Sequence, residues 1–422
     1  MMKIRHAPLF TLVFGLLVVI TSACTYPIES LLPTTDTVPP PTITSTALPT
    51  ETRTPRPPTD TPLPPTVTPT ASPSPTSTTL PDSNRTLPGT SPLISAQNLT
   101  QLGLYAQLPV GEDELSLGEL AFSPSDDRLA FATDIGALVV WDLATYDPLY
   151  TFETAEREQG VAYPDVAFAP PAGQYLGANG NAFLDQYAEY WGVALQWTLP
   201  ITETEDLEAG TVISPTILAG TSHWAKTGVT YTPDGGRLVV GTREGMGGGG
   251  SVKVWASETG ESLLDISTLE WITDVVVSPD GSTIVGTTYG QVLLWDSVSG
   301  DEKFAISIIE GPLWGLALSP NGRLLAVWGD STVYLVDQFN GTVVYQLEGE
   351  SEIVSAVFTP NGRMLISADG DTIRYWDVAS YQSLSTLQLP EPIVGLAISA
   401  DGRSLAIGTA EGVVYLWGIL NN

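Results

Sequence analysis

The strongest constraint on the fold of this chain is a short turn sequence that recurs seven times after residue 93. Most copies combine a small polar residue, Pro, Asp or Asn, and Gly, as in SPDGS at 278–282. Pro presets φ in such a turn, and Gly takes the left-handed position that closes a hairpin. The other copies stand at 123–127, 169–173, 232–236, 319–323, 359–363 and 399–403. Each turn lies between two apolar strand segments, so the sequence predicts a series of β-hairpins and an all-β fold.

A second marker fixes the length of the repeated unit. After each turn and the strand that follows it comes a further strand that ends near Trp-Asp. These ends are Trp141, Trp197, Trp255, Trp295, Val336, Trp376 and Trp417, spaced by 56, 58, 40, 41, 40 and 41 residues. Self-similarity at a fixed period of this length indicates a repeat architecture with one supersecondary element per unit. We expect the six tryptophans to be structural.

The period of 40–41 residues, together with the terminal Trp-Asp, resembles the WD40 repeat, in which each unit is one four-stranded propeller blade. The resemblance covers residues 93–422 and implies a seven-bladed β-propeller. The last unit ends at Asn422 directly after its third strand, whereas Leu93–Leu108 precedes the first full unit and has no blade of its own. WD40 propellers often complete the last blade with such a segment, so we expect it to close the ring without an open sheet edge.

The chain also departs from the family pattern. The Gly-His that usually precedes the first strand is missing from nearly every unit, and only His223 stands near that place. The buried His–Ser/Thr–Asp–Trp network of the family therefore cannot recur here, and Val336 replaces Trp in the fifth unit. We expect apolar packing to provide most of the stability of the blades. Periplasmic propellers with SPDG-rich repeats but no Trp-Asp are a related class that remains open.

The first 23 residues are typical of an export signal. Lys3 and Arg5 precede a 13-residue apolar run, Pro8–Ile20, which is shorter than the roughly 20 residues of a membrane-spanning helix. Thr21-Ser22-Ala23 then precede Cys24, the one cysteine of the chain. This arrangement resembles a bacterial lipobox and implies lipid attachment at Cys24. Ordinary signal-peptidase cleavage with secretion is the alternative, and an uncleaved anchor is a third possibility.

The following segment, residues 24–92, has the composition of a disordered stalk. Thr25–Pro92 contains 18 Pro, 20 Thr and 7 Ser among its 68 residues, and Tyr26 is its sole aromatic residue. Such a segment has too little apolar surface to offset the entropy of ordering, and its Pro content favours extended polyproline II. We predict a spacer that holds the propeller away from the membrane; an interaction tail is the alternative.

Composition narrows the chemistry that the propeller could perform. The chain carries 47 acidic and 16 basic residues, a formal charge of −31, so its overall field would repel nucleic acid and anionic lipid. One Cys and two His exclude a disulfide framework and nearly exclude metal centres and histidine-based catalysis. We predict no enzyme activity, no metal and no cofactor. Gly245–Gly250 matches the dinucleotide-binding GxGxxG only formally, because a strand follows it, and Asp369-Gly370-Asp371 fits a turn.

The candidate binding site is a group of aromatic residues. Units two and three are 15–18 residues longer than the others, and we expect the extra sequence to extend the loops between their second and third strands. In a propeller these loops share one face with the connections that enter each blade. The aromatic residues expected there are Phe183, Tyr187, Tyr190, Trp191, Trp224, Trp271 and Trp314. Exposed, they would form a binding site for a protein segment or a sugar ring; packing onto the extended loop itself is the alternative.

Together these features predict a lipid-anchored propeller outside the cytoplasm of a bacterium. Its expected function is that of a non-catalytic scaffold or recognition domain for other surface or envelope proteins, which the family resemblance implies, because the fold alone hosts both platforms and enzymes. The alternative is binding or hydrolysis of a small ligand such as a sugar or lactone. Perturbed carboxylates converging on the central channel would favour that alternative, an aromatic patch away from it would favour the platform, and a mere spacer domain would show neither.

Overall fold

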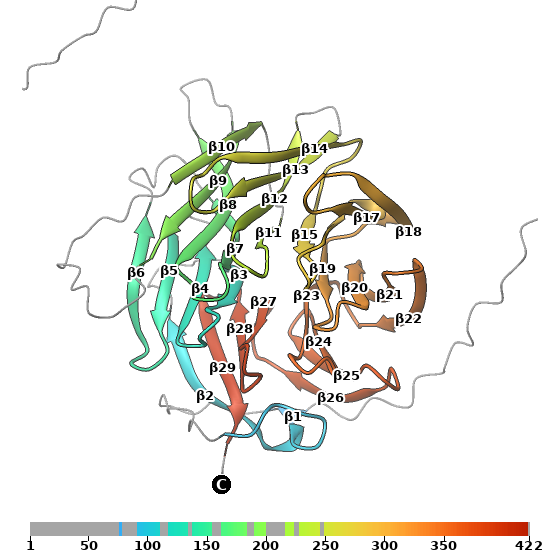
Figure 1. Cartoon of the computed structure of the whole chain (residues 1–422). Helices are drawn as coiled ribbons and strands as arrows, with labels where there is room; N and C mark the ends of the chain where they lie inside the picture. Colours follow the sequence, from blue (N-terminus) through green and yellow to red (C-terminus); the bar gives the residue numbers. More distant parts are fainter. Residues whose placement is uncertain are drawn as a thin grey trace, which may run out of the picture. The chain divides into compact units, whose positions relative to one another are not determined.

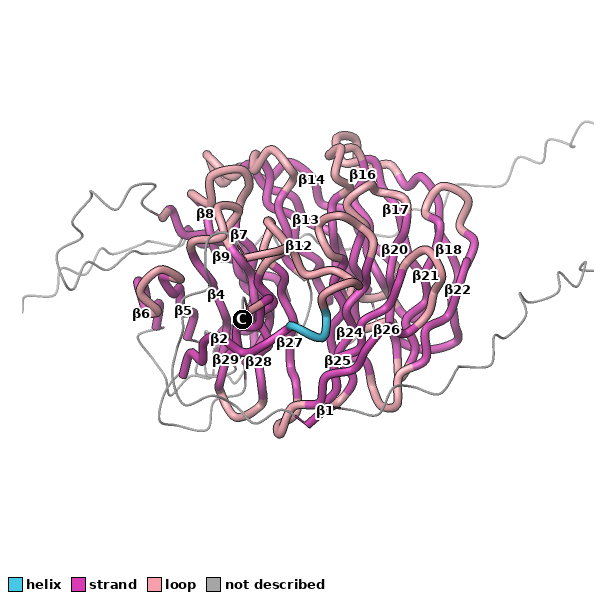
Figure 2. Tube along the Cα trace, turned by 90° about the horizontal axis from the view of Figure 1, so that it is seen from below, coloured by secondary structure: helices cyan, strands magenta, loops and turns pink. Residues whose placement is uncertain are grey.

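The computed structural model describes residues 76–77, 91–109, 117–133, 137–153, 162–183, 190–199, 216–222, 228–244 and 249–420. The predicted export signal, Cys24 and nearly all of the predicted stalk lie outside these residues. Within them the strands form seven antiparallel sheets arranged around a central axis, as expected for a seven-bladed β-propeller (Figure 1). Figure 2 views the ring from the side, with turns and loops along both faces.

Each blade contains four strands, and in blades 1 to 6 the chain runs from the innermost strand to the outermost. Blade 1 consists of β3 (Leu117–Phe122), β4 (Arg128–Thr133), β5 (Ala137–Asp142) and β6 (Asp147–Glu153), and blade 2 of β7 (Ala162–Phe168), β8 (Tyr175–Phe183), β9 (Tyr190–Thr198) and β10 (Thr216–Ser222). Blade 3 consists of β11 (Val229–Tyr231), β12 (Arg237–Glu244), β13 (Gly249–Ala256) and β14 (Ser262–Thr268), and blade 4 of β15 (Asp274–Val277), β16 (Thr283–Thr287), β17 (Tyr289–Asp296) and β18 (Glu302–Pro312).

The remaining blades complete the ring. Blade 5 consists of β19 (Gly315–Leu318), β20 (Leu324–Gly329), β21 (Thr332–Asp337) and β22 (Thr342–Glu348), and blade 6 of β23 (Ile353–Phe358), β24 (Met364–Asp369), β25 (Thr372–Asp377) and β26 (Ser383–Gln388). Blade 7 combines β27 (Ile393–Ile398), β28 (Ser404–Thr409) and β29 (Val413–Ile419) with the N-terminal β2 (Leu102–Pro109). A two-residue strand in the predicted stalk, β1 (Thr76–Ser77), pairs in parallel with β26.

The predicted ring closure is confirmed. After the 3₁₀ turn η1 (Leu99–Gln101), β2 pairs antiparallel with β29, with Leu104 opposite Trp417. The side chains of Leu104, Tyr105 and Leu108 are buried at 3%, 4% and 0% exposure, so the N-terminal segment is a full member of the last blade. Both ends of the propeller chain therefore share one sheet.

Apolar packing between neighbouring blades forms the core. The strand-terminal indoles of Trp197, Trp295 and Trp417 are among the largest fully buried side chains, and Val336 fills the corresponding place in blade 5 at 0% exposure. Trp197 of blade 2 packs against Phe152 of blade 1 with ring centroids 5.1 Å apart. The hydrophobic clusters accordingly combine residues of adjacent sheets, which is how a ring of separate blades acquires a continuous core.

The strand order divides the loops between two faces. We call the face with the seven recurrent turns, between the first and second strands of each blade, the turn face. The opposite face, which carries the loops between second and third strands and the connections between blades, is the connection face. The β8–β9 and β12–β13 loops both belong to it, as expected. In the third unit, counted from Trp197 to Trp255, the longest addition to the sequence stands instead between two strands of blade 2, because β9 ends at Thr198 and β10 begins at Thr216.

Candidate functional site

Exposed apolar side chains gather on the connection face of blades 3 to 5. We call Leu269, Trp271, Tyr289 and Trp314 the aromatic surface. Leu269 is 97% exposed, Tyr289 51% and Trp314 47%, whereas Trp271 is half-buried. Single exposed apolar side chains are common, and Val298 and Phe339 are exposed at 68% and 72% on the turn face. The four residues of the aromatic surface share one face of three consecutive blades, which makes this face available for contact.

Backbone hydrogen bonds join the three segments that carry these side chains. The connection from blade 3 to blade 4, which holds Leu269 and Trp271, is tied to the end of β16 by the amide of Thr273 donating to the carbonyl of Thr287 at 2.9 Å. The connection from blade 4 to blade 5 is tied to the same turn, since Leu313 donates to Thr288 at 3.3 Å and Pro312 pairs with Tyr289. The aromatic surface is therefore carried by adjoining, mutually braced segments.

A cation–π contact fixes part of this surface. The guanidinium of Arg243, at the end of β12, lies 3.6 Å from the centroid of the Trp271 ring. Such a stacked pair orders both side chains and is worth about 0.5–1 kcal/mol where it remains solvated. Arg243 thereby covers part of Trp271, whereas Tyr289 and Trp314 are more exposed to solvent.

Acidic groups accompany the aromatic surface on the connection face. Glu270 lies between Leu269 and Trp271, and Asp330 stands in the β20–β21 turn of blade 5. Between blades 5 and 6 the side chain of Glu350 is 79% exposed and pairs at 2.9 Å with Arg374, whose guanidinium also contacts the buried Asp369 at 3.2 Å. Arg374 and Glu350 thus neutralise each other, whereas the exposed carboxylates of Glu270 and Asp330 add negative charge to the connection face of blades 3 to 5.

Three carboxylates line the central channel. Glu119, Asp165 and Asp274 stand in the innermost strands of blades 1, 2 and 4, each four positions before the turn that follows, and are half-buried. Burial and the nearby carboxylates of Asp165 and Asp274 raise the pKa of Glu119 well above its usual range. Burial, followed by the charge of Asp274, raises the pKa of Asp165 to about 8. Burial raises the pKa of Asp274 to about 7, against the effect of two amide hydrogen bonds.

Backbone amides occupy two of these carboxylates and link neighbouring blades. Asp165 accepts hydrogen bonds from the amides of Val166, in its own blade, and Val229, in blade 3. Asp274 accepts from Val275 at 2.7 Å and from Leu316 of blade 5 at 2.9 Å. Among the described residues no group of three or more His, Cys, Asp or Glu is placed to hold a metal ion. Both aspartates therefore act as braces between inner strands.

A protein-family model for the WD domain, G-beta repeat (WD40) matches residues 341–377. The matched segment ends with the third strand of blade 6, where Trp376 Nε1 donates to Ser367 Oγ at 2.9 Å. That hydrogen bond is a remnant of the polar network expected to be missing, and it accompanies the Trp-Asp terminus within seven blades closed by β2. The chain is a WD40-repeat β-propeller.

This WD40 propeller resembles known proteins over part of their length. It is 29% identical over 160 residues to the small ribosomal subunit protein RACK1y of Oryza sativa subsp. japonica, a match that covers 35% of this chain and 47% of the rice protein. It is 27% identical over 203 residues to telomerase protein component 1 of Mus musculus, covering 47% of this chain and 8% of the mouse protein. The matches span less than half of each relative. WD40 propellers generally bind other proteins.

The structure places only some of the residues predicted to form the binding site of the propeller. Trp271 and Trp314 belong to the aromatic surface. Phe183 pairs with Tyr190, and Trp191 follows, at the ends of β8 and β9 on the connection face, but nothing is described of these three side chains. Tyr187 and Trp224 lie outside the described residues, so their part in binding stays a prediction. Sequence reasoning missed Leu269 and Tyr289, which stand in the same kinds of connection.

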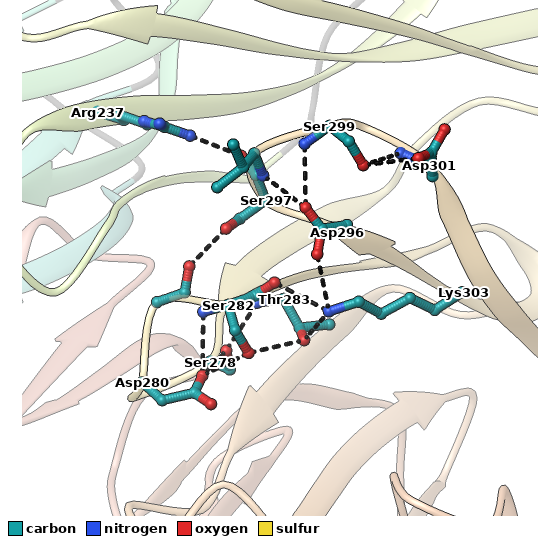
Figure 3. Close-up of polar contacts among 12 residues, drawn as sticks. Arg237, Ser278, Asp280, Ser282, Thr283, Asp296, Ser297, Ser299, Asp301 and Lys303 are labelled. Carbon is teal, nitrogen blue, oxygen red and sulfur yellow. Dashed lines mark hydrogen bonds and ion pairs between the residues drawn. The ribbon is translucent and has the colours of Figure 1, made fainter.

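A shallow pocket on the turn face is a weaker candidate. It has a volume of about 270 Å³ and lies between the turns of blades 3 and 4, beside Arg237, Asp280 and Val298. Its polar groups already serve the fold (Figure 3): Arg237 Nη1 donates to the carbonyl of Ser297 at 2.7 Å. Hydrogen bonds from Ser278 and Ser282 lower the pKa of Asp280 to about 2, so this carboxylate acts as a turn acceptor.

Proposed function

We propose that this WD40 propeller is a non-catalytic scaffold that binds other envelope proteins through the aromatic surface while a lipid on Cys24 holds it at a bacterial membrane. Its sequence supports the anchor through the apolar run, the small residues before Cys24 and the Thr/Pro-rich stalk. Among the described residues no helix is long and apolar enough to cross a membrane. A lipid on Cys24 would be the attachment.

The exposure of Tyr289 and Trp314 is the observation that carries the proposal. Interface residues that contribute most to binding are enriched in Trp, Tyr and Arg. Of these, Trp and Tyr bury large rings at a low cost in side-chain entropy. Here two such rings stand on braced segments of a rigid ring and can be covered without rearrangement. The acidic residues beside them favour a partner segment that carries Lys or Arg next to apolar side chains.

The test is a crosslinking capture from native cell envelopes with the full chain as bait. In the test bait, Tyr289→Ala and Trp314→Ala remove the most exposed rings of the aromatic surface. The matched control bait carries Val298→Ala and Phe339→Ala, which remove apolar side chains of 68% and 72% exposure from the turn face. We expect the same proteins with the parent and control baits and their loss with the test bait. Equal capture by all three baits would refute the aromatic surface as the binding site.

Membrane attachment is tested separately. Cys24→Ala in the full chain removes the thiol that a lipid would occupy, so the variant is expected in the culture medium or the soluble envelope fraction instead of the membrane pellet. Metabolic labelling with an alkyne fatty acid provides the direct readout. Label on the parent and none on the variant supports the anchor, whereas membrane association without any label would refute lipid attachment.

The raised pKa values of Asp165 and Asp274 favour a second candidate, a small-ligand site in the channel. Against it, backbone amides already bind both carboxylates, so neither is free to exchange a proton with a substrate without breaking a brace. Differential scanning against a panel of sugars and lactones tests it. A thermal shift in the parent that disappears in Asp274→Asn, with protein capture unaffected by the aromatic variants, would favour the ligand site over the scaffold.

A further inference from the structure

Contacts between consecutive turns form a regular ring on the turn face. The glycine of each turn packs against the proline of the turn in the preceding blade. The six pairs are Pro124–Gly173, Pro170–Gly235, Pro233–Gly281, Pro279–Gly322, Pro320–Gly362 and Pro360–Gly402. At five of them a Cβ on the glycine would lie 3.2–3.6 Å from the proline Cδ, and at Gly235 it would overlap the carbonyl oxygen of Pro170. The glycines all have φ between 67° and 74°, where a side chain is strained.

The seventh junction, between blades 7 and 1, is built differently on both sides. Ala400 stands in blade 7 where the other turns have proline, and Asp126 stands in blade 1 where they have glycine, at φ 60°. The carboxylate of Asp126 accepts hydrogen bonds from the amides of Ala400 at 2.6 Å and Asp401 at 2.8 Å. A proline at 400 would have no amide hydrogen to donate. The two departures therefore depend on each other.

We propose that Asp126 and Ala400 form a closure key, a pair of residues that directs blade 7 to pack on blade 1 and on no other blade. If Asp126 faced a turn with proline, its carboxylate would lose a donor. If Ala400 faced a turn with glycine, its amide would lose its acceptor. Because six junctions consist of the same proline–glycine contact, that contact does not determine which two turns pack together. A junction that is unfavourable with any other turn determines the pairing, as a single buried polar residue does in a coiled coil.

The key lies beside the seam of the ring, which is the non-covalent pairing of β2 with β29 inside blade 7; the chain itself continues from β2 to β3 of blade 1. The same 399–403 turn is also held from the N-terminal side, because the amide of Ile94 donates to the carbonyl of Gly402 at 2.9 Å. At the adjoining start of β28, Tyr105 Oη donates to Ser404 Oγ at 2.9 Å. Every one of these contacts joins the last unit to residues that precede or begin the first. If blade 7 paired elsewhere, all of them would be lost together.

The electrostatics indicate selection rather than strong attachment. Partial burial raises the pKa of Asp126, the two amide hydrogen bonds act in the opposite direction, and the nearby charges of Asp401 and Asp127 raise it further. The ionised carboxylate of Asp126 therefore destabilises the junction unless the amides of both Ala400 and Asp401 donate to it. A polar group of this kind discriminates between partners at some expense of stability.

A double-mutant cycle on the full chain tests the proposal. Its members are the parent, Asp126→Gly, Ala400→Pro, and the double variant, which installs at the seam the proline–glycine junction of the other six. The readout is native-state hydrogen exchange of peptides covering β2 and β29, with β20 of blade 5 as an internal reference. The matched control is Gly281→Asp, which places an aspartate against Pro233, a residue that has no amide hydrogen to donate.

We expect Ala400→Pro alone to accelerate exchange in β2 and β29 about tenfold, equivalent to about 1.4 kcal/mol, and the double variant to return to within about threefold of the parent. Gly281→Asp should accelerate exchange around blades 3 and 4 and leave the seam unchanged. The proposal is overturned if Ala400→Pro has the same effect in the Asp126→Gly background as in the parent. If Ala400→Pro fails to fold, Asp126→Asn and Ala400→Gly decide: the former should loosen the seam and the latter, which keeps the amide, should not, and the reverse would overturn the key.

Discussion

Replacing Asp274 with Asn should reduce the dependence of the propeller's stability on pH. The carboxylate of Asp274 bridges the amides of Val275 and Leu316 and lies half-buried at the channel, where burial raises its pKa from 3.8 to about 7. The unfolded chain releases that proton near pH 4. Between about pH 4 and 7 the folded state therefore binds more protons than the unfolded state, and the free energy of unfolding falls as the pH rises through this window.

The size of the effect follows from the pKa shift. Three units at about 1.4 kcal/mol each would give roughly 4 kcal/mol for a fully enclosed group. Only about two of these units lie between pH 5 and pH 8, which corresponds to roughly 2.7 kcal/mol. Because the side chain remains partly open to channel water, which screens its charge, we expect about half of this, ~1.4 kcal/mol. Asn cannot ionise, so the free energy of unfolding of the Asp274→Asn variant should lack this contribution. The Asn side chain has a single acceptor oxygen and can keep only one of the two amide hydrogen bonds, so the variant should be about 1–2 kcal/mol less stable than the parent at pH 5.

Urea unfolding followed by tryptophan fluorescence at pH 5, 6, 7 and 8 measures both quantities. Salt should be held at a high, constant concentration so that repulsion within a chain of formal charge −31 is screened. Asp280→Asn is the control, because the pKa of Asp280 is lowered to about 2 and its charge is constant over this range. Equal differences between pH 5 and pH 8 in the parent and in Asp274→Asn would refute the assignment of the raised pKa to a structural brace.

Three further predictions concern packing and closure. Trp376→Phe should destabilise the propeller by about 1 kcal/mol more than Trp417→Phe in urea titrations, because the Trp376 indole donates to Ser367 whereas that of Trp417 has no hydrogen-bond partner among the described residues. Trp314→Ala should change the unfolding free energy by no more than about 0.5 kcal/mol, since a larger loss would mean that the ring packs against the propeller itself and is not available to a partner. Deleting Leu102–Pro109 should abolish the cooperative transition seen by calorimetry, because β29 would be left as an open edge; an unchanged transition would contradict closure by β2.

The architecture was predictable because the turn and the terminal Trp recur in phase. A Pro-Asp-Gly turn needs only local chemistry, and the buried position of Trp295 or Trp417 follows from strand alternation. Closure by β2 followed from counting strands, since the last unit lacks a fourth. The predicted place of the extra residues in the third unit was wrong, because they stand between β9 and β10 and not between a second and a third strand. Nothing in the sequence of 199–215 distinguishes the two positions.

The channel carboxylates share a sequence position relative to the recurrent turns, which the alternation of apolar and polar residues alone does not reveal. Glu119, Asp165 and Asp274 each stand four positions before the first residue of a recurrent turn, where the third unit has Gly228. Within one strand, such an acid resembles an ordinary solvated residue. Only the ring geometry shows that Asp274 occupies the space left by that glycine of the neighbouring blade: a Cβ on Gly228 would overlap its carboxylate.

The braces and the closure key explain how this propeller tolerates the loss of the polar network that a WD40 blade normally carries. That network works within a blade and is represented here by the Trp376–Ser367 pair, whereas the indole nitrogens of Trp141 and Trp417 have no such partner among the described residues. In its place, carboxylates accept amide hydrogens across the junctions between blades: Asp165 from blade 3, Asp274 from blade 5 and Asp126 from blade 7. Since each of these carboxylates also has a raised pKa, the polar contribution to stability has moved from the interior of the blades to their junctions and should be sensitive to pH there. The blades themselves depend on apolar packing, which is indifferent to pH. Mild alkali should therefore loosen the ring at the junctions braced by Asp165 and Asp274 before any blade unfolds.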